Sequence, residues 1–293
     1  MRADPPWRAY AALALTVAGI AWSAIFVRWA GVPGTASGFY RVLIAAAVLV
    51  PWRVARGATP RLDRRAALLA MAGGAFFAFD LALWNTAVLR TQAAIASLLG
   101  NNTPIVVGLA SWWIFKRRPS GAFWAGLLLS IAGCILIVIA ESGGASSAAP
   151  HSLSGDVFAL TASVFFAAYL ITTERIRERM DTLTFNTLAI AGSVMTLFIL
   201  CLLLGVPLIG YPARAWGALL ALGLISQLAA YFALVYALGH LPATITSVGL
   251  LAQVPCTALL AMALLGEPLS IWQIAGGALV LAGIYLVNRR EAH

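Results

Sequence analysis

The sequence predicts an all-α integral membrane protein in which ten transmembrane helices form two inverted five-helix repeats, with both termini in the cytoplasm. Three observations support this prediction. Of 293 residues, 62% are hydrophobic and 10% are charged, against roughly 25% charged residues in soluble domains. Apolar segments of membrane-spanning length occupy nearly the whole chain, and the second half of the chain repeats the pattern of the first.

Ten apolar segments have the length of a transmembrane helix, which needs about 20 mostly apolar residues. They occupy residues 9–30, 36–52, 66–88, 92–115, 121–140, 155–174, 183–204, 214–238, 243–265 and 270–287. The first is too long for the hydrophobic region of a cleaved signal peptide, so we expect it to be retained. The spans leave no room for a separate soluble domain.

The basic residues predict the orientation of these spans. With the N-terminus inside, the cytoplasmic side carries Arg2, Arg8, Arg53, Arg56, Arg61, Arg64, Arg65, Lys116, Arg117, Arg118, Arg175, Arg177, Arg179, Arg289 and Arg290. The outer side then carries only Arg90 and Arg214, while Arg28 and Arg41 lie near outer helix ends, where we expect them to snorkel. The formal charge of +9 thus reflects topology. Because the charges are scattered over short turns, nucleic-acid binding is excluded, and we expect membrane lipid with anionic headgroups as a partner.

An internal repeat relates the two halves of the chain. The segment "SLLGNNTPIVVGLASWW" in the first half resembles "VGLLAQVPCTALLAMAL" in the second, so that Pro104 matches Pro255 and Asn102 matches Gln253 at a shift of 151 residues. We therefore expect two copies of one folding unit.

The odd number of helices in each copy predicts that the copies are inverted. After five spans the chain is on the opposite side of the membrane, so the second copy enters upside down. We divide the chain into a first repeat (1–140), an extracytoplasmic polar linker (141–154) and a second repeat (155–293). Inverted repeats are typical of secondary transporters that work by alternating access.

The matched prolines predict helix breaks in the middle of the membrane. Pro104 and Pro255 each remove a backbone donor, and a freed carbonyl in hydrocarbon needs a partner, so such breaks should face a cavity. Asn101, Asn102 and Gln253 supply amide donors and acceptors at the same depth. The alternative is that these amides only join neighbouring helices, which is worth about 0.6 kcal/mol each.

Aromatic and polar side chains recur four residues apart on other spans and so share helix faces. These pairs are Trp22 with Phe26, Asp80 with Trp84, Phe165 with Tyr169, and Gln227 with Tyr231. A cavity with aromatic walls and a few amides suits a solute with an apolar body and a polar or ammonium group. The alternative is aromatic packing between helices.

Asp80 is the only acidic residue deep within a predicted span. An intramembrane carboxylate indicates a functional site, and it would bind a substrate ammonium group or carry a coupling proton. The structural alternative is an ion pair with Arg28 or Arg41.

The fifth and tenth spans carry glycines seven residues apart, at Gly126 and Gly133 and at Gly276 and Gly283. Glycines on one face allow close helix approach. We therefore expect each of these spans to pack as scaffold against its own repeat, away from the solute path.

Nothing in the sequence indicates an enzyme. The cysteines Cys134, Cys201 and Cys256 lie within spans without metal-binding spacing, and we find no phosphate-binding loop, catalytic triad or acidic pair suited to hydrolysis. We expect no cofactor and no metal.

Taken together, the segments "GFYRVLIAAAVL", "TPIVVGLASWWIFKRRPS" and "VPCTALLAMALLGEPLS" resemble the duplicated EamA-type members of the drug/metabolite transporter superfamily, over essentially the whole chain. The overall pattern is closest to bacterial aromatic amino-acid exporters. One departure is "FKRRPS" after the fourth span, where the family usually has a glutamate, so that Glu267 in the second copy has no counterpart.

What the resemblance implies is export of small metabolites, commonly amino acids, through a central cavity. We therefore expect a monomeric inner-membrane exporter of amino acids, including aromatic and large apolar ones. Its expected substrate-binding residues are Trp22, Phe26, Asp80, Trp84, Asn101, Asn102, Phe165, Tyr169, Gln227, Tyr231 and Gln253. The alternatives are an exporter of other metabolites or drug-like cations, and a membrane scaffold or receptor that transports nothing.

Overall fold

The computed structural model describes residues 6–57, 63–90, 99–114, 116, 118–142, 152–265 and 270–291, and the regular structure within these ranges is entirely helical. Nine helices in the described ranges are long and apolar enough to cross a membrane, and Thr103–Trp113 is a shorter apolar helix. The predicted all-helical membrane architecture is therefore confirmed. Residues 92–98 of the fourth predicted span, most of the 141–154 linker and Glu267 lie outside the described residues.

The helices follow one another in two similar series. The first half contains α1 (Pro6–Ala21), α2 (Ser23–Ala30), α3 (Gly34–Ala55), α4 (Arg64–Arg90), α6 (Thr103–Trp113) and α7 (Gly121–Ser142). The second half contains α8 (Leu153–Arg177), α9 (Thr182–Leu203), α10 (Ala213–Ala221), η1 (Leu222–Ala229), α11 (Ala230–Leu238), α12 (Ala243–Gly249), η2 (Leu250–Ala252), α13 (Gln253–Leu265) and α14 (Ile271–Glu291). Here η1 is a π-helix and η2 is a single 3₁₀ turn.

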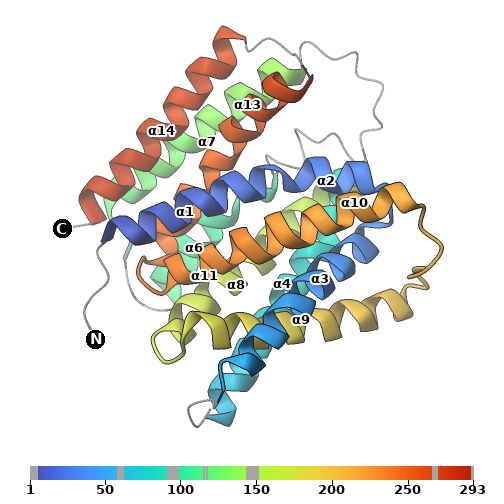
Figure 1. Ribbon diagram of the computed structural model, residues 1–293. Coiled ribbons are helices and arrows are strands. Elements are labelled where there is room, and N and C mark those ends of the chain that lie inside the picture. The colour runs from blue at the N-terminus through green and yellow to red at the C-terminus, as the bar shows by residue number, and fades with distance from the viewer. Residues whose placement is uncertain are drawn as a thin grey trace.

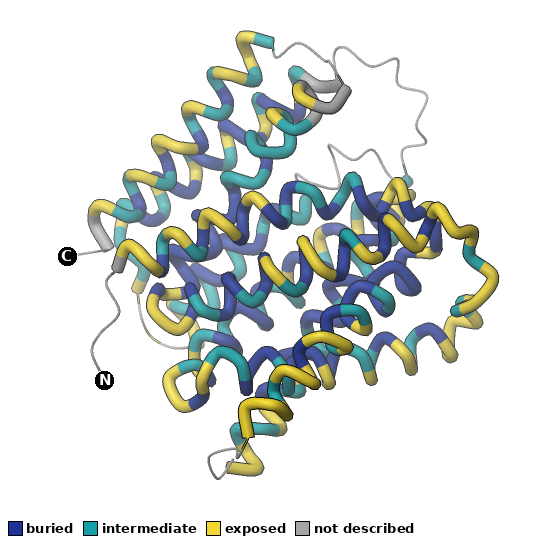
Figure 2. The backbone as a smooth tube through the Cα atoms, in the orientation of Figure 1, coloured by how far each residue is buried: buried dark blue, intermediate teal, exposed yellow. Residues whose placement is uncertain are grey.

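Helices from the two halves alternate in space. Helix α4 packs against α8 and α9, α3 packs against α9 and η1, and α1 packs against α11. Figure 1 shows α1 running beside α11 and α2 beside α10, with α7 and α14 paired at one side of the molecule. Buried residues gather along the lines where these helices meet, and exposed residues occupy the outward faces (Figure 2). Many exposed side chains are large and apolar, such as Leu15, Ile139, Leu202 and Leu281, which suits a surface that faces lipid.

Glycines set how closely the helices cross. A Cβ atom on Gly74 of α4 would lie 1.9 Å from the carbonyl oxygen of Ala189 on α9, and one on Gly192 would lie 2.3 Å from that of Met71. No real side chain tolerates such distances, so only glycine allows these two backbones to touch. Small residues at crossings are the usual means of helix association in membranes, where lipid removes the hydrophobic drive.

Helices α7 and α14 pack mainly against each other, whereas we expected each to pack against its own repeat; α14 also contacts α12 and α13 of its own repeat. The expectation that both would lie away from the solute path is wrong for α7, because Ile137 and Val138 line the cavity described below. A Cβ atom on Gly126 would lie 2.5 Å from the carbonyl oxygen of Gly283, and one on Gly133 would lie 2.5 Å from that of Gly276. The pairs run in opposite directions along the chain, so the two helices are antiparallel. The bare glycine faces make this contact between the halves closer than side chains would allow.

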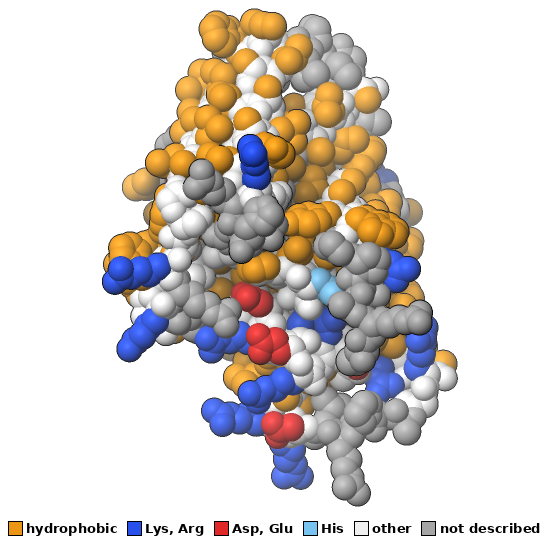
Figure 3. All heavy atoms as spheres, turned by 90° about the vertical axis from the view of Figure 1, so that its left-hand side faces the viewer, with side chains coloured by type: hydrophobic (Ala, Val, Ile, Leu, Met, Phe, Trp, Pro, Cys, Tyr) orange, Lys and Arg blue, Asp and Glu red, His pale blue; other side chains and the backbone are white. Residues whose placement is uncertain are grey.

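The first residues of α1 and the last of α14 lie at the same end of the molecule (Figure 1). Figure 3 looks towards that end and shows Lys and Arg side chains over its lower part, with hydrophobic side chains above them. A hollow of about 590 Å³ between the start of α4, the end of α8 and the start of α12 is lined by charged residues that include Arg65, Glu174, Glu178 and Arg179.

Candidate functional site

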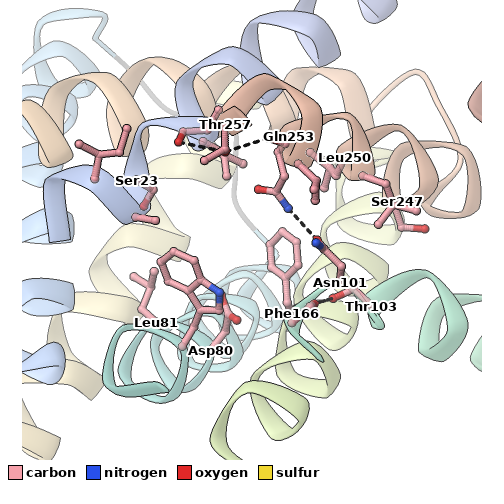
Figure 4. A pocket seen from close by; sticks show the side chains of 18 of the residues that line it. Ser23, Asp80, Leu81, Asn101, Thr103, Phe166, Ser247, Leu250, Gln253 and Thr257 are labelled. Atoms are coloured by element: carbon pink, nitrogen blue, oxygen red, sulfur yellow. Dashed lines mark hydrogen bonds between the residues drawn. The ribbon is translucent and has the colours of Figure 1, made fainter. Parts of the chain in front are cut away.

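A cavity of about 360 Å³ lies within the helix bundle and is lined by residues of both halves. Its walls come from α1, α2, α3, α4 and α7, from α8 and α11, and from the residues around two interrupted helices, α6 and α12–α13. The volume falls within the range of about 300 to 1,000 Å³ that is usual for small-molecule sites. Figure 4 shows the side chains that surround it.

The first interruption precedes α6. Leu99 and Gly100 are helical, Asn101 and Asn102 form a turn, and α6 then begins at Thr103, with Pro104 in its first turn. Proline is well placed there because the first N–H groups of a helix need no partner within the helix. The side-chain amide of Asn102 donates to the carbonyl of Leu99 at 2.8 Å. Asn102 therefore stabilises the turn, whereas Asn101 lines the cavity.

The second interruption lies between α12 and α13. The single 3₁₀ turn of η2 separates them, and Pro255 falls in the first turn of α13, as Pro104 does in α6. The hydroxyl of Thr257 lies 2.8 Å from the carbonyl oxygen of Gln253 and 3.3 Å from that of Ala21, the last residue of α1. The junction between α1 and α2 at Trp22 thus meets the second interruption at the cavity.

A hydrogen bond joins the two interruptions across the cavity. The side-chain amide of Gln253 donates to the side-chain carbonyl of Asn101 at 2.9 Å, and the two groups point towards each other in Figure 4. The bond therefore links the two halves of the chain.

Arg41 is a buried cation in the wall of this cavity. It is 1% exposed, so the expectation that it would snorkel to the interface is wrong. Its Nε donates to Oε1 of Gln227 and its Nη1 donates to Oγ of Ser23, both at 2.8 Å. These two bonds hold the guanidinium inside the bundle. Arg28, by contrast, is exposed at the end of α2.

The close approach of η1 to α3 makes this arrangement possible. A Cβ atom on Gly223 would lie 2.6 Å from Cβ of Ile44 and 3.3 Å from the carbonyl oxygen of Arg41. The π-helical residues Leu222–Ala229 include Gln227, the partner of Arg41. Short π-helical segments inside α-helices occur frequently at functional sites.

Asp80 of α4 also lines the cavity and is 8% exposed. In the part of the chain that the structure describes, no cationic side chain lies within salt-bridge distance of its carboxylate. The ion pair with Arg28 or Arg41 that the sequence left open is therefore not formed in this structure, although the guanidinium of Arg41 is near enough to act on Asp80 electrostatically.

The structure brings together five of the eleven residues that the sequence singled out. The residues that line the cavity are Asp80, Trp84, Asn101, Tyr231 and Gln253, and Pro104 lines it as well. The six that lie outside its lining are Trp22, Phe26, Asn102, Phe165, Tyr169 and Gln227. Among the six, Trp22 stacks on Phe26 with ring centres 5.5 Å apart, and Tyr169 lies behind the wall against Phe77, at 4.9 Å.

The rotation of α8 decides which of two adjacent phenylalanines reaches the cavity. Phe165 packs against Phe76 and Phe79, with ring centres 6.4 and 5.1 Å apart, and Phe166 lines the cavity instead. Consecutive residues on a helix point about 100° apart. The four-residue spacing of Phe165 and Tyr169 correctly places them on one face but does not reveal which face points inward.

Several cavity residues were not predicted from the sequence. They are Ser23, Arg28, Trp29, Arg41, Thr103, Phe166, Ser247 and Thr257. Arg41 had a usable signal, because a charged residue inside a span is a functional hypothesis by default. The serines and threonines had none, since such residues are common in transmembrane helices, where they bond to their own backbone.

Comparisons with known proteins establish the class to which the chain belongs. The model of the EamA-like transporter family matches residues 7–139 and 153–289. The chain therefore belongs to the EamA-like transporter family, a family of membrane transporters and not of enzymes. A solved crystal structure with 21% sequence identity aligns with a TM-score of 0.78 over 96% of both chains, which shows a shared fold.

Two relatives illustrate the range of similar proteins. The uncharacterized transporter YwfM of Bacillus subtilis is 28% identical over 207 residues, which are 70% of this chain and 68% of YwfM. The pseudopaline exporter CntI of Pseudomonas aeruginosa is 27% identical over 265 residues, which are 89% of this chain and 88% of CntI. Neither name gives an amino acid as the substrate.

Proposed function

We propose that this transporter is a multi-pass exporter of the bacterial inner membrane that moves amino acids, including aromatic and large apolar ones, by alternating access. The observation that carries the proposal is the cavity, because it holds aromatic, amide and charged side chains from both halves of the chain. The rings of Trp84 and Phe166 offer surface to an apolar side chain, and the amides of Asn101 and Gln253 offer donors and acceptors to a polar head group.

The contact between α7 and α14 supports the inverted arrangement of the two repeats. The repeat equates Gly126 with Gly276 and Gly133 with Gly283, while the contacts pair Gly126 with Gly283 and Gly133 with Gly276. If each residue is replaced by its equivalent in the other half, the contact of Gly126 with Gly283 becomes the contact of Gly276 with Gly133. A two-fold axis perpendicular to the antiparallel helices has this property, and it agrees with repeats at 1–140 and 155–293.

The distribution of charge supports the orientation. The start of α1 and the end of α14 lie at one end of the molecule, and basic side chains lie on that face (Figure 3). By the positive-inside rule this end is cytoplasmic, which puts the 141–154 linker outside. The glycine faces that could have formed a dimer are already used within the chain, which favours a monomer surrounded by lipid.

A second candidate is an exporter of another small metabolite. The similarity to the pseudopaline exporter supports this alternative. Asp80 has no salt bridge within the described ranges, which keeps a drug-like cation as a candidate. Both candidates use the same cavity and differ only in what fills it.

Efflux from proteoliposomes tests the proposal. Purified protein is reconstituted into vesicles loaded with amino acids, nucleosides and an organic cation, and protein-free vesicles serve as the control. We expect loss of amino acids, with aromatic and large apolar ones leading. Loss of nucleosides or the cation alone would replace the substrate class, and no efflux with or without a pH gradient would favour the scaffold hypothesis.

Thiol labelling tests the orientation. In a variant without the three native cysteines, Ser147→Cys in the linker should react with an impermeant reagent in intact cells. Arg56→Cys, at an exposed position after α3, should react only after lysis. The opposite pattern would invert the topology.

A further inference from the structure

The guanidinium of Arg41 is buried, and only two of its three nitrogens have hydrogen-bond partners among the described residues. Nε and Nη1 have fixed partners in Gln227 and Ser23, whereas Nη2 has no hydrogen-bond partner among the described residues. Nη2 carries two N–H groups. A buried donor on a charged group is seldom left unsatisfied, and an exception calls for a physical explanation.

The surroundings of Arg41 hold it in place without neutralising its charge. Its Cζ lies 5.0 Å from the ring centre of Tyr231 and 6.0 Å from that of Phe77. The face of an aromatic ring attracts the positive charge of a guanidinium, but it does not accept the hydrogen bonds that the N–H groups donate in the guanidinium plane. The side chain is therefore preorganised, and its Nη2 atom has no hydrogen-bond partner among the described residues.

Asp80 places the opposite charge in the wall of the same cavity. The two side chains line one space and yet form no salt bridge with each other. Charged groups within a membrane protein are usually paired or serve a substrate pathway. Two opposite charges that share a cavity without pairing are complementary to a solute that carries both signs.

We propose that Arg41 determines specificity by binding the carboxylate of the substrate through Nη2, while Asp80 faces the substrate ammonium group. This inference rests on the proposed function and deepens it. The planar fork of arginine matches a carboxylate in a way that lysine does not. Zwitterions are therefore exported in preference to an amine or an acid of the same shape.

The competing explanation is that Arg41 only joins α2, α3 and η1 through its two hydrogen bonds. A structural arginine and a carboxylate-binding arginine predict different substrate patterns. Loss of a structural link lowers the export of every solute in parallel and lowers thermal stability. Loss of a carboxylate partner lowers the export of solutes that have a carboxylate and spares those without one.

The test compares three solutes of similar shape: phenylalanine, phenethylamine, which lacks the carboxylate, and 3-phenylpropionate, which lacks the ammonium group. Efflux of each is measured from proteoliposomes of the wild-type protein. We expect phenylalanine to leave roughly tenfold faster or more, the factor expected for a charge-assisted hydrogen bond. Equal rates for phenylalanine and phenethylamine in the wild-type protein would overturn the inference without requiring any variant.

Variants then assign the preference to Arg41. In Arg41→Gln we expect phenylalanine efflux to fall by roughly tenfold or more while phenethylamine efflux is retained. Arg41→Lys keeps the charge without the fork, and we expect it to raise the KM for phenylalanine more than that for phenethylamine. Arg56→Gln removes an exposed arginine from the end of the same helix and should change neither phenylalanine efflux nor phenethylamine efflux.

The outcomes separate this inference from the proposed function. If the wild-type protein moves none of the amino acids tested, the proposed function fails and the inference fails with it. If it moves amino acids but both Arg41 variants keep the wild-type preference, only the inference fails. A parallel fall for all three solutes, with a lower thermal midpoint, would make Arg41 structural.

Discussion

The central cavity and the contact between α7 and α14 each join the two halves of the chain, but the cavity leaves polar groups unpaired among the described residues, whereas the contact is fully packed. At the contact, Gly126 and Gly133 bring two backbones together with no space for a single added carbon. In the cavity, Arg41 keeps free donors and Asp80 has no salt bridge among the described residues. We therefore propose that stability and transport depend on different residues of the molecule.

This separation follows from what each region contributes in lipid. Close backbone contact supplies the van der Waals packing that holds membrane helices together, so a change there alters the free energy of unfolding. Polar groups in the proposed substrate cavity leave interactions for a solute to complete, so we expect a change there to alter flux. Each prediction below tests one side of the comparison against a matched control.

The largest effect is expected for Gly126→Ala combined with Gly133→Ala. Each new Cβ atom would lie 2.5 Å from a carbonyl oxygen of α14, so the helices must move apart, at a cost of about 1–3 kcal/mol for each site. The thermal midpoint of the purified protein measures the loss. Gly217→Ala in α10 meets no atom within 4 Å and should leave the midpoint unchanged. Equal thermal midpoints for the two variants would show that the glycine contact between α7 and α14 does not stabilise the protein.

The next largest effect is expected for Asp80→Asn, this time on transport. Loss of the charge should lower amino-acid efflux by roughly tenfold or more, because a charge-assisted interaction with the substrate is removed. The thermal midpoint should be retained, since the carboxylate forms no salt bridge among the described residues. Asp63→Asn, at an exposed position before α4, is the control. A large loss of stability with full efflux would reverse the roles of the two regions.

The same variant tests whether Asp80 carries a coupling proton. If it does, an imposed pH gradient accelerates export by the wild-type protein and has no effect on Asp80→Asn. Acceleration that persists in the variant would exclude Asp80 as the proton carrier and leave its binding role to be judged from the solute series.

A smaller effect is expected from the bridge between the two interruptions. Asn101→Ala and Gln253→Ala should each lower efflux, and the double variant should cost less than the sum, because one hydrogen bond of about 0.5–1.5 kcal/mol is shared. Asn102→Ala is the matched neighbour outside the cavity lining and should have the milder effect on flux. Additive losses would show that the two amides act independently.

The smallest effect is expected from the aromatic wall. Phe166→Leu should reduce efflux of tryptophan relative to leucine by a few fold, as expected for one aromatic contact of roughly 0.5–1.5 kcal/mol. Phe165→Leu, which changes a ring packed against Phe76 and Phe79, should leave that ratio unchanged. The reverse result would show that α8 presents its other face to the solute.

These variants also mark where sequence reasoning reached its limit. Helix spacing grouped Phe165 with Tyr169 and correctly implied a shared face, but rotation about the helix axis depends on what surrounds the helix. Asn101 and Asn102 are adjacent and identical, and only the turn before Thr103 directs one amide to Gln253 and the other to the carbonyl of Leu99. No pattern of spacing distinguishes the two residues in advance.

The sequence by itself determined that this protein is an all-helical membrane protein of the EamA-like transporter family, because composition, span length and motif similarity need no contacts to be recognised. Only the tertiary structure decided which helices the glycines join, where Arg41 lies and which residues line the cavity. The physical reason is that a bilayer selects helices from local hydrophobicity, whereas their rotation, interruptions and partners come from packing between segments far apart in the chain.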